Sequence, residues 1–413
     1  MNKEFFINNR RNLVKSIKNN SMLILFAGEA PQKSADEAYS FTPNRNFYYM
    51  SGIARENMIL MITKIKDKVK EILFIEKADP VLEKWVGKRM TEEEAKEISG
   101  VENVQFLEDF EGYVSRLMLN YEMNRLYLDL ERRGWDSIPS VTQTFANKIT
   151  ENYPQLKIKN IYHDICSLRV IKTEEEIVEI RKAIDITNDG IKSLMTNMRP
   201  GMMEYQIEAH FDYVLKCSGV KDYAFQTIAA SGINGTVLHY SENNTKTQDG
   251  DLILFDLGAQ WNYYNADISR TFPLNGKFTE RQKQIYNIVL KAMEDTMAVI
   301  KPGVPYSKLN ETTRASLAES LKSIGLIKED SELSKYYYHG VSHYLGLDTH
   351  DVGDRDLELK PGMVLTIEPG LYIEEEKIGI RIEDDVVVTK NGYENLAKDI
   401  IKTVDDVEAF MNR

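Results

Sequence analysis

Cysteine is scarce in this sequence, whose 413 residues include only two, Cys166 and Cys217. Two cysteines cannot build the disulfide framework that stabilises small secreted domains, so we expect a reducing, cytoplasmic setting. The sequence also lacks an apolar run of about eighteen residues, the shortest stretch that crosses a bilayer as a helix. We therefore expect no membrane partner.

Positive charge is in deficit as well. The 52 lysine and arginine residues are outnumbered by 64 aspartate and glutamate residues, which gives a formal net charge of −12 and a pI near 5.2. Proteins that bind nucleic acids carry basic surfaces, so this balance argues against a nucleic-acid partner.

The first residues combine basic side chains with a short apolar run, Met22–Gly28, as signal peptides do. The run is at the short end for a signal peptide, and no cleavage site of small residues follows it cleanly. A first helix that leads into a buried first strand explains the segment better. We therefore predict that the segment belongs to the fold.

Strand-like and helix-like patterns alternate through residues 1–155, which is typical of a small α/β domain. We place a domain boundary near residue 160, because a long amphipathic helix follows Asp164–Thr173. The prediction is an N-terminal domain of residues 1–160 and a second domain of residues 161–413. In the first domain, the predicted strands are Met22–Gly28, Met58–Lys64, Glu71–Ile75 and Arg125–Leu130, and the predicted helices are Glu92–Ile98 and Asp109–Leu119.

The second domain repeats one pattern twice. A helix ends near a basic-Pro-Gly segment, first at Arg199–Gly201 and again at Lys301–Gly303, and a hairpin with acidic residues follows each time. The second of these helices opens with Thr279 as N-cap and Gln282 three residues later, which is a capping-box pattern. Pro-Gly also ends unrelated helices. Together with the matching hairpins, however, it predicts two halves related by a pseudo-twofold around one cleft.

Each hairpin carries two carboxylates. The first has Asp256 near the end of an apolar strand and Asp267 in the returning strand, and the second has Glu368 and Glu383 in the corresponding places. Four carboxylates in apolar strands would be costly if unpaired, because a buried anion loses its hydration. A bound cation, or two, is the simplest way to hold them together.

Four of the six histidines fall in non-helical stretches of the second domain: His239, His339, His343 and His350. A lone histidine is more often a satisfied core or surface residue than a ligand. The last three lie within twelve residues, beside glycines and just upstream of an acidic hairpin, so that explanation is weaker for them.

Strand parity sorts the other charged residues near the second hairpin. Arg381 and Glu383 are two residues apart and share a face of the strand, so we expect the arginine to orient that carboxylate. Asp348 and Asp351 flank His350, and they either position it or are solvated in a loop.

The predicted ligand set contains four carboxylates and one imidazole: Asp256, Asp267, His343, Glu368 and Glu383. The four negative charges suit two divalent ions better than one, and oxygen-rich ligation favours Mn²⁺ or a similar ion over a thiolate-type zinc site. Two ions about 3.5–4 Å apart share a water molecule and lower its pKa, which supplies a hydroxide nucleophile at neutral pH. We therefore predict a hydrolase that acts on an amide or ester.

Three segments carry long, ordered motifs: His339–Gly353, Thr366–Tyr372 and Gly379–Asp385. They resemble motifs of the Xaa-Pro aminopeptidases (aminopeptidase P), which belong to the pita-bread metallopeptidases. Ser34–Asp36 and Phe47–Gly52 resemble parts of that family's first domain. The resemblance covers nearly the whole chain. It implies an α/β N-terminal domain and an α+β pita-bread catalytic domain with an internal pseudo-twofold.

The resemblance also implies roles for the predicted ligands. Asp267 and Glu383 would bridge two ions, commonly manganese, and Asp256 would complete the shell of one ion. His343 and Glu368 would complete the shell of the other. Glu368 would also accept a proton from the bridging water as the general base.

Residues outside the ligand set match the family's substrate contacts. His239 and His350 match histidines that contact the substrate and the transition state, and His339 matches one that lines the pocket for proline. Asp36 resembles an acid of the first domain near the substrate's amino end. Trp85 resembles a tryptophan that reaches a neighbouring subunit's active site in family dimers or tetramers, although packing within its own domain is an equal alternative.

The implied reaction releases the N-terminal residue of a peptide whose second residue is proline. The scissile amide is tertiary and lacks an N–H, so most peptidases cannot recognise it. The nearest alternative is prolidase, the dipeptidase of the same fold with the same five ligands. A metal-free pita-bread protein, either a creatinase-like hydrolase or a binding module, is the alternative from another class. The short loop Ile373–Ile378 borders the expected cleft, so it bears on the accepted peptide length.

Overall fold

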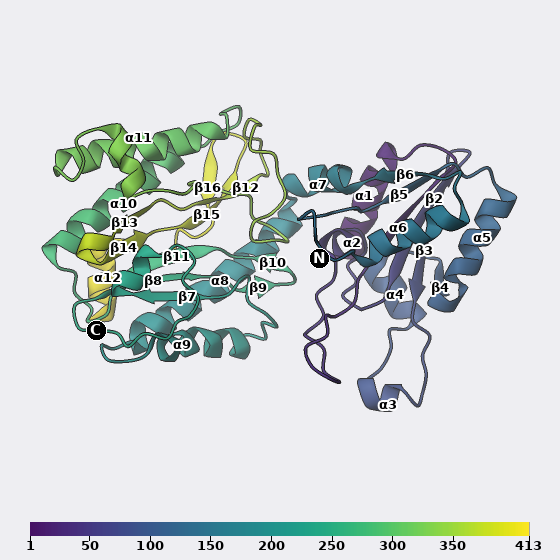
Figure 1. Ribbon diagram of the computed structural model, residues 1–413, viewed down its shortest axis with the longest axis horizontal. Helices are drawn as coiled ribbons and strands as arrows, with labels where there is room; N and C mark the ends of the chain where they lie inside the picture. Colours follow the sequence, from purple (N-terminus) through teal and green to yellow (C-terminus); the bar gives the residue numbers. More distant parts are fainter. Residues whose placement is uncertain (413) are drawn as a thin grey trace. The chain divides into compact units, whose positions relative to one another are not determined.

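A six-stranded sheet organises the N-terminal unit, Met1–Arg169, of the computed structural model, which describes residues 1–412 (Figure 1). The strand order is β4-β3-β2-β1-β5-β6. Strand β2 runs antiparallel to both of its neighbours, and the other adjacent pairs are parallel. The strands are β1 (Ser21–Phe26), β2 (Ile59–Ile65), β3 (Lys68–Ile75), β4 (Val104–Phe106), β5 (Arg125–Leu128) and β6 (Lys157–Asn160).

The sequence pattern predicts β1, β2, β3 and β5 but misses β4 and β6. The two missed strands lie at the two edges of the sheet and contain three and four residues. Their side chains are half-buried or exposed, so they lack the apolar run that marks a buried strand.

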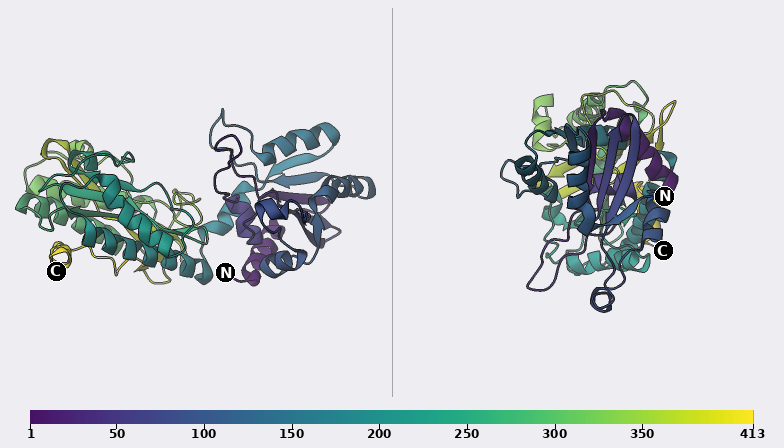
Figure 2. Two further views of the ribbon diagram at one scale, coloured as in Figure 1. Left: turned by 90° about the horizontal axis from the view of Figure 1, so that it is seen from below. Right: turned by 90° about the vertical axis from the view of Figure 1, so that its right-hand side faces the viewer.

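Helices cover both faces of this sheet (Figure 2, right). On one face, Phe110 and Val114 of α5 and Ile149 of α6 pack with Met22 and Ile24 of β1 in a single apolar core. This packing holds α5 and α6 on that face of the sheet. The helices of the unit are α1 (Lys3–Leu13), α2 (Arg45–Ser51), α3 (Glu83–Val86), α4 (Glu92–Ser99), α5 (Phe110–Asn120) and α6 (Val141–Asn152).

The basic and apolar N-terminal segment is part of this fold, as predicted. Helix α1 precedes the central strand β1. Arg10 of α1 is fully buried, and its Nε donates to Glu71 Oε2 at 2.8 Å. Among residues 1–412, we find no helix with the length and apolar character that crossing a membrane requires.

Two helix pairs form the outer layer of the C-terminal unit, which begins at Val170 (Figure 1). Helix α8 packs on α9, and α10 packs on α11. Thr279 and Gln282 form the predicted capping box at the start of α10. The helices are α7 (Tyr162–Val170), which contains the division between the units, α8 (Glu174–Asn197), α9 (Glu204–Cys217), α10 (Glu280–Ala298), α11 (Ser307–Ser323) and α12 (Val404–Met411).

Each helix pair is followed by a hairpin that breaks in its middle. In the first hairpin, β8 pairs with β11, and β9 pairs with β10 beyond the break. In the second, β12 pairs with β15, and β13 pairs with β14 beyond the break. The two broken hairpins thus repeat one plan, but they differ in their third strand, because β7 pairs with the outgoing strand β8 and β16 pairs with the returning strand β15. The strands are β7 (Ile228–Ser231), β8 (Leu252–Leu257), β9 (Gln260–Trp261), β10 (Tyr264–Asn265), β11 (Ile268–Pro273), β12 (Val364–Ile367), β13 (Gly370–Ile373), β14 (Ile378–Arg381), β15 (Asp384–Val388) and β16 (Tyr393–Asn395).

Two close backbone approaches fix the hairpins and what lies beside them. A Cβ atom at Gly258 would lie 1.9 Å from the carbonyl oxygen of Ala266, across the first break. A Cβ atom at Gly379 of β14 would lie 1.9 Å from the carbonyl oxygen of Gly235. Only glycine permits contacts this short. The second hairpin therefore packs directly against the segment that leads to His239.

Candidate metal centre

A cavity of about 200 Å³ in the C-terminal unit brings the predicted site residues together. It contains all five predicted metal ligands, the three other histidines of interest, and Arg381. Asp36 and Trp85 belong to the N-terminal unit. The lining residues are Leu238, His239, Asp256, Asp267, His339, Gly340, Ser342, His343, His350, Arg355, Glu368, Arg381 and Glu383.

The hairpin breaks place the carboxylates at this cavity. Asp267 immediately precedes β11, Glu383 immediately precedes β15, and Glu368 immediately follows β12. Asp256 lies in β8, opposite Ser269. A break bends the strand and re-aims its side chains. Each hairpin therefore directs two acids toward one point, although its flanking residues are buried and apolar.

His343 reaches the carboxylates from a segment that runs along β12. Its backbone nitrogen donates to Thr366 Oγ1, and its carbonyl accepts from the Thr366 nitrogen. The Nδ1 atom of its ring lies 3.0 Å from the Tyr344 carbonyl oxygen, so Nδ1 carries the proton and donates there. In the neutral ring that a metal ion would bind, this tautomer leaves the Nε2 lone pair facing the acids.

The ligand atoms lie close enough to share an ion. One ligand atom each from Asp267, His343 and Glu383 lies within 4.8 Å of the others. The Nε2 atom of His343 is 3.3 Å from Asp267 Oδ2 and 3.7 Å from Glu368 Oε1. These three residues and Glu368 thus form one compact cluster.

The electrostatics of this cluster favour a cation. Burial raises the pKa of Asp267 to about 6 and that of Glu368 to about 7, and it raises the pKa of Glu383 well above its usual range. Repulsion between the carboxylates adds to each shift. Burial lowers the pKa of His343, but its hydrogen bond with Asp267 and its attraction to Asp267 and Glu368 together outweigh burial and raise that pKa to about 9. A divalent cation would replace these protons.

Two carboxylate oxygens give a direct test of whether a metal ion fits. Among residues 1–412, Asp256 Oδ1 and Glu383 Oε1 are buried and accept no hydrogen bond. An unpaired buried carboxylate oxygen is costly and calls for an explanation. A cation beside these oxygens would satisfy both, so the donor set fits divalent metal ions.

Arg381 and Glu383 line one cavity, in keeping with their shared parity. The Nη2 of Arg381 donates to Asp256 Oδ2 at 2.7 Å, and its Nε donates to Ser269 Oγ at 2.7 Å. The Ser269 hydroxyl in turn donates to Glu383 Oε2 at 2.8 Å. Arg381 therefore bonds Asp256 directly and reaches Glu383 through Ser269.

Asp351 is not solvated in a loop, which excludes one of its two predicted interpretations. Its Oδ2 accepts from Lys172 Nζ at 2.8 Å, and both side chains are almost completely buried. This contact anchors the loop after His350 to the residue that precedes the N-cap of α8.

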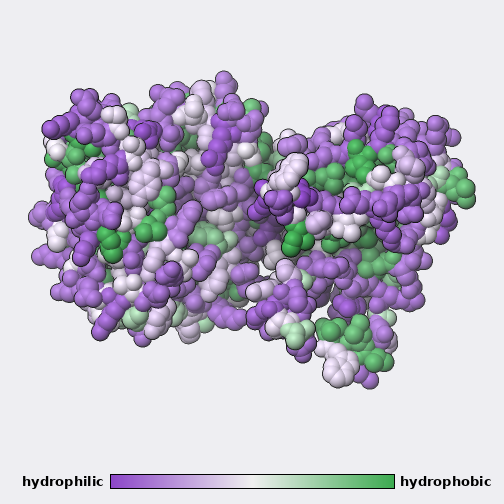
Figure 3. Space-filling view, viewed as in Figure 1, coloured by the Kyte–Doolittle hydropathy of each residue, from purple (hydrophilic) through white to green (hydrophobic). Residues whose placement is uncertain are grey.

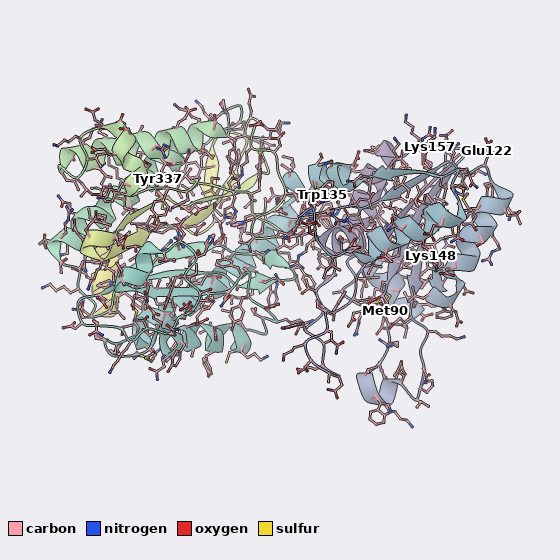
Figure 4. The ribbon with its side chains drawn as sticks, in the orientation of Figure 1. Met90, Glu122, Trp135, Lys148, Lys157 and Tyr337 are labelled. Carbon is pink, nitrogen blue, oxygen red and sulfur yellow. The ribbon has the colours of Figure 1, made fainter. Side chains whose placement is uncertain are left out.

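His339 stands beside Glu368 with a defined tautomer. Its Nδ1 lies 2.8 Å from the Gly340 carbonyl oxygen, which assigns the proton to Nδ1, and its Nε2 accepts from the Tyr372 hydroxyl at 2.9 Å. Burial lowers the pKa of His339 to about 4, so the ring is neutral near pH 7. Tyr337, labelled in Figure 4, packs its ring 4.8 Å from that of His339 between centroids.

The other two histidines are exposed at the cavity. His350 lies with its ring centroid 4.3 Å from that of His343 in an edge-on arrangement. Burial, and then the nearby His343, lower the pKa of His350. His239 lines the cavity from another segment, just after Leu238. Both side chains can therefore meet a molecule that enters the cavity.

Sequence reasoning missed three supporting residues. Tyr372 joins His339 to Arg381, since Arg381 Nη1 donates to its hydroxyl at 3.0 Å. The carboxylate of Asp385 is fully buried and accepts from the Asp267 backbone nitrogen at 3.1 Å. The third is Ser269, which lies two residues after a predicted ligand, so strand parity could have found it.

The two predicted residues of the N-terminal unit are exposed there. Trp85 is 84% exposed in α3, with Val81, Leu82 and Val86 also exposed around it (Figure 3). This exposure excludes the alternative that Trp85 packs within its own domain. Asp36 lies in an exposed bend between β1 and α2.

Comparisons with known proteins agree with this geometry. The profile of metallopeptidase family M24 matches residues 178–390, and the profile of the aminopeptidase P N-terminal domain matches residues 6–127. Xaa-Pro aminopeptidase of Escherichia coli is 33% identical over 435 residues, which cover 100% of this chain and 98% of that protein. The chain belongs to the aminopeptidase P family of M24 metallopeptidases.

Solved structures of this family share the whole fold. A candidate aminopeptidase P from Bacillus anthracis is 56% identical, with a TM-score of 0.98, and the match covers 100% of this chain and 99% of that one. Aminopeptidase P from E. coli with the inhibitor Pro-Leu is 32% identical, with a TM-score of 0.91 and coverage of 100% and 98%. The M24 match includes every residue that lines the metal cavity.

Proposed function

We propose that this enzyme removes the N-terminal residue from peptides in which proline is second. The observation that carries the proposal is the convergence of Asp256, Asp267, His343, Glu368 and Glu383 on one cavity, with two buried carboxylate oxygens that lack a partner among residues 1–412. The family membership and the full-length similarity to a protein named Xaa-Pro aminopeptidase supply the substrate class.

Two divalent ions would be held by the five ligands. Asp267 and Glu383 would be shared between the ions, Asp256 would hold one of them, and His343 and Glu368 would hold the other. The oxygen-rich donor set favours Mn²⁺. When bound, such ions lower the pKa of a shared water molecule and so supply a hydroxide near neutral pH.

The protein residues accept the proton, contact the substrate and orient a metal ligand. Glu368 accepts a proton from the attacking water, and its Oε2 lies 3.7 Å from His339 Nδ1. His239 and His350, exposed at the cavity, contact the substrate and its tetrahedral intermediate. Arg381 holds Asp256 in place through the 2.7 Å hydrogen bond and thereby keeps one ligand fixed.

The preference for proline follows from the missing amide proton. A residue that precedes proline contributes a tertiary amide, so the enzyme cannot rely on an N–H at that bond. His339 and the ring of Tyr372 form an aromatic wall near Glu368, which suits the apolar pyrrolidine ring. Recognition would then rest on the shape of the ring.

We also propose a cytoplasmic, homo-oligomeric enzyme. Both cysteines are free thiols, as expected in a reducing compartment. Trp85 and its exposed apolar neighbours in α3 would contact a second copy of the chain in a dimer or tetramer, and Asp36 would contribute near the substrate's amino end. An exposed apolar group of this kind is typical of an interaction surface.

The test is hydrolysis of Xaa-Pro-Yaa tripeptides and Xaa-Pro dipeptides, each with Mn²⁺ and with a chelator. Chelator-sensitive release of Xaa from the tripeptides supports the proposal. Cleavage confined to dipeptides identifies a prolidase instead. Hydrolysis that withstands chelation, together with purified protein that contains no metal, identifies a metal-free hydrolase.

A further inference from the structure

A second cavity, of about 440 Å³, lies in the C-terminal unit and has no role in the reaction described above. We call it the outer cavity. One wall comes from Ile233 and Thr236, in the segment packed against β14. The other walls come from Lys335 and Tyr338 on one segment and from Tyr372, Glu374 and Glu375 on the second hairpin.

The outer cavity adjoins the metal cavity along three chain segments. Thr236 lines the outer cavity, and Leu238 lines the metal cavity two residues later. Tyr338 lines the outer cavity, and its neighbour His339 lines the metal cavity. The hydroxyl of Tyr372 bonds to two residues of the metal cavity, while Tyr372 itself lines the outer one. The two cavities therefore adjoin at Tyr372 and at two neighbouring chain segments.

Two contacts of Tyr338 fix the boundary between the two cavities. The Tyr338 hydroxyl donates to the Thr236 carbonyl oxygen at 2.8 Å, which ties two of the segments together. The rings of Tyr338 and Tyr372 lie 5.3 Å apart between centroids. The outer cavity thus has a fixed aromatic wall and lies next to the metal cavity.

The geometry of an aminopeptidase substrate decides what can occupy this space. Only one residue lies on the amino side of the scissile bond, and every further residue lies on the carboxyl side. An extended chain advances about 3.3 Å per residue, so the residue after proline lies beyond the proline pocket. We propose that the outer cavity is the subsite for the peptide residue that follows proline. This inference rests on the proposed function.

The charges of the outer cavity favour a basic side chain there. Lys335 forms an ion pair with Glu375, so these two charges offset each other. Within residues 1–412, Glu374 has no ion pair or side-chain hydrogen bond, and it leaves the cavity with a net negative charge. A guanidinium could meet this carboxylate and stack on the ring of Tyr338, which is 49% exposed. Arginine after proline should therefore be preferred over glutamate.

The experiment compares kcat/KM for Ala-Pro-Arg-Ala, Ala-Pro-Ala-Ala and Ala-Pro-Glu-Ala, with Ala-Pro-Ala-Arg as the position control. We expect arginine at the third position to exceed glutamate by about fivefold, as a single exposed ion pair allows, and the ratio to fall with added salt. In Glu374→Gln the ratio should approach one. Glu376→Gln is the matched control, because Glu376 pairs with Arg281 and does not line the cavity; it should keep the wild-type ratio.

The outcomes separate this inference from the proposed function. If no Ala-Pro peptide is cleaved, the proposed function fails. If the peptides are cleaved without a charge preference at the third position, the subsite assignment is overturned. A preference that persists in Glu374→Gln, or that occurs only at the fourth position, also overturns it.

Discussion

The two broken hairpins share one plan, yet each holds the ligands of the other. Arg381 of the second hairpin fixes Asp256 of the first. Ser269 of the first hairpin fixes Glu383 of the second. The carboxylates of a hairpin are thus oriented by side chains outside that hairpin. The site therefore depends on how the two halves of the unit are packed, and a single hairpin does not contain it.

The two hairpins differ at their tips. The first turn consists of Asn262 and Tyr263, and the amide of Asn262 donates to Glu179 of α8 at 3.0 Å. The second turn, Glu374–Lys377, is exposed and lines the outer cavity with two of its acids. Both tips are tied to a helix, because Glu376 in the second turn pairs with Arg281 of α10. The second tip differs in that it also lines the outer cavity, which we propose as a substrate subsite.

The strongest test of the shared site is Glu383→Gln. We expect kcat to fall by more than about 100-fold, because the loss of a bridging ligand should exceed the usual effect of losing a residue that merely orients one. Metal content by mass spectrometry should drop, while circular dichroism should retain the fold. Near-normal activity with full metal occupancy would falsify the bridging role.

Arg381 fixes Asp256 and Ser269 fixes Glu383, and we call this reciprocal support the bracing of the two hairpins. It predicts two smaller and unequal losses of kcat. Arg381→Lys should lower kcat by about 100-fold and Ser269→Ala by about tenfold, since lysine cannot replace three directed hydrogen bonds at once. Metal titration of each variant should show weaker binding. The control is Arg281→Lys, which alters an exposed pair with Glu376 and should leave kcat unchanged. Equal losses, or tight metal binding in both variants, would contradict the bracing.

Removing the metal should make stability depend on pH. In the metal-free protein, burial raises the pKa of Asp267 to about 6 and that of Glu368 to about 7, above their unfolded values. Raised carboxyl pKa values stabilise the fold below the unfolded pKa, and that stability is lost as pH rises through the folded pKa. We expect the Tm of chelated protein to fall by about 5 °C between pH 4.5 and pH 7.5.

The metal-loaded protein provides the comparison for that measurement. Bound cations keep the carboxylates ionised in the folded state, so this part of the pH dependence should disappear. Scanning calorimetry with and without Mn²⁺ across the same pH range measures the difference. Parallel curves for the two forms would rule out a buried metal centre at these residues.

These comparisons also define what the sequence could reveal. Apolar runs and capping boxes predict the central strands and the start of α10, because buried elements leave a strong local pattern. The ligand set is recognisable because charged residues in apolar strands are costly to bury unless a partner offsets their charge. The break in the first hairpin is not visible in the sequence, since it depends on the close approach of Gly258 to the Ala266 carbonyl oxygen. Parity places Arg381 near Glu383, but it cannot show that Arg381 bonds Asp256 directly and Glu383 only through Ser269.

Contacts between residues that are distant in the sequence cannot be predicted from local pattern either. Lys172 and Asp351 are far apart in the sequence, and only the folded chain shows that they form a buried pair. Asp385 reads as one acid in a run of three, yet its carboxylate supports the backbone of Asp267. Catalytic and metal-binding residues are often predictable from the local sequence pattern. The residues that orient them are not, because their roles depend on tertiary contacts.

The smallest expected effect is a change in unfolding free energy caused by substitutions in the two hairpin tips. Lys377 has φ of 54° and Asn262 has φ of 47°, so both occupy the left-handed region. Glycine adopts this region without strain, whereas asparagine tolerates it better than lysine does. Lys377→Gly should therefore raise the unfolding free energy by about 0.5 kcal/mol, net of the added chain entropy. Asn262→Gly should lower it instead, because that change also removes the hydrogen bond to Glu179. Denaturant titration of both variants decides the matter, and stabilisation by both would mean that the first tip is not anchored as described.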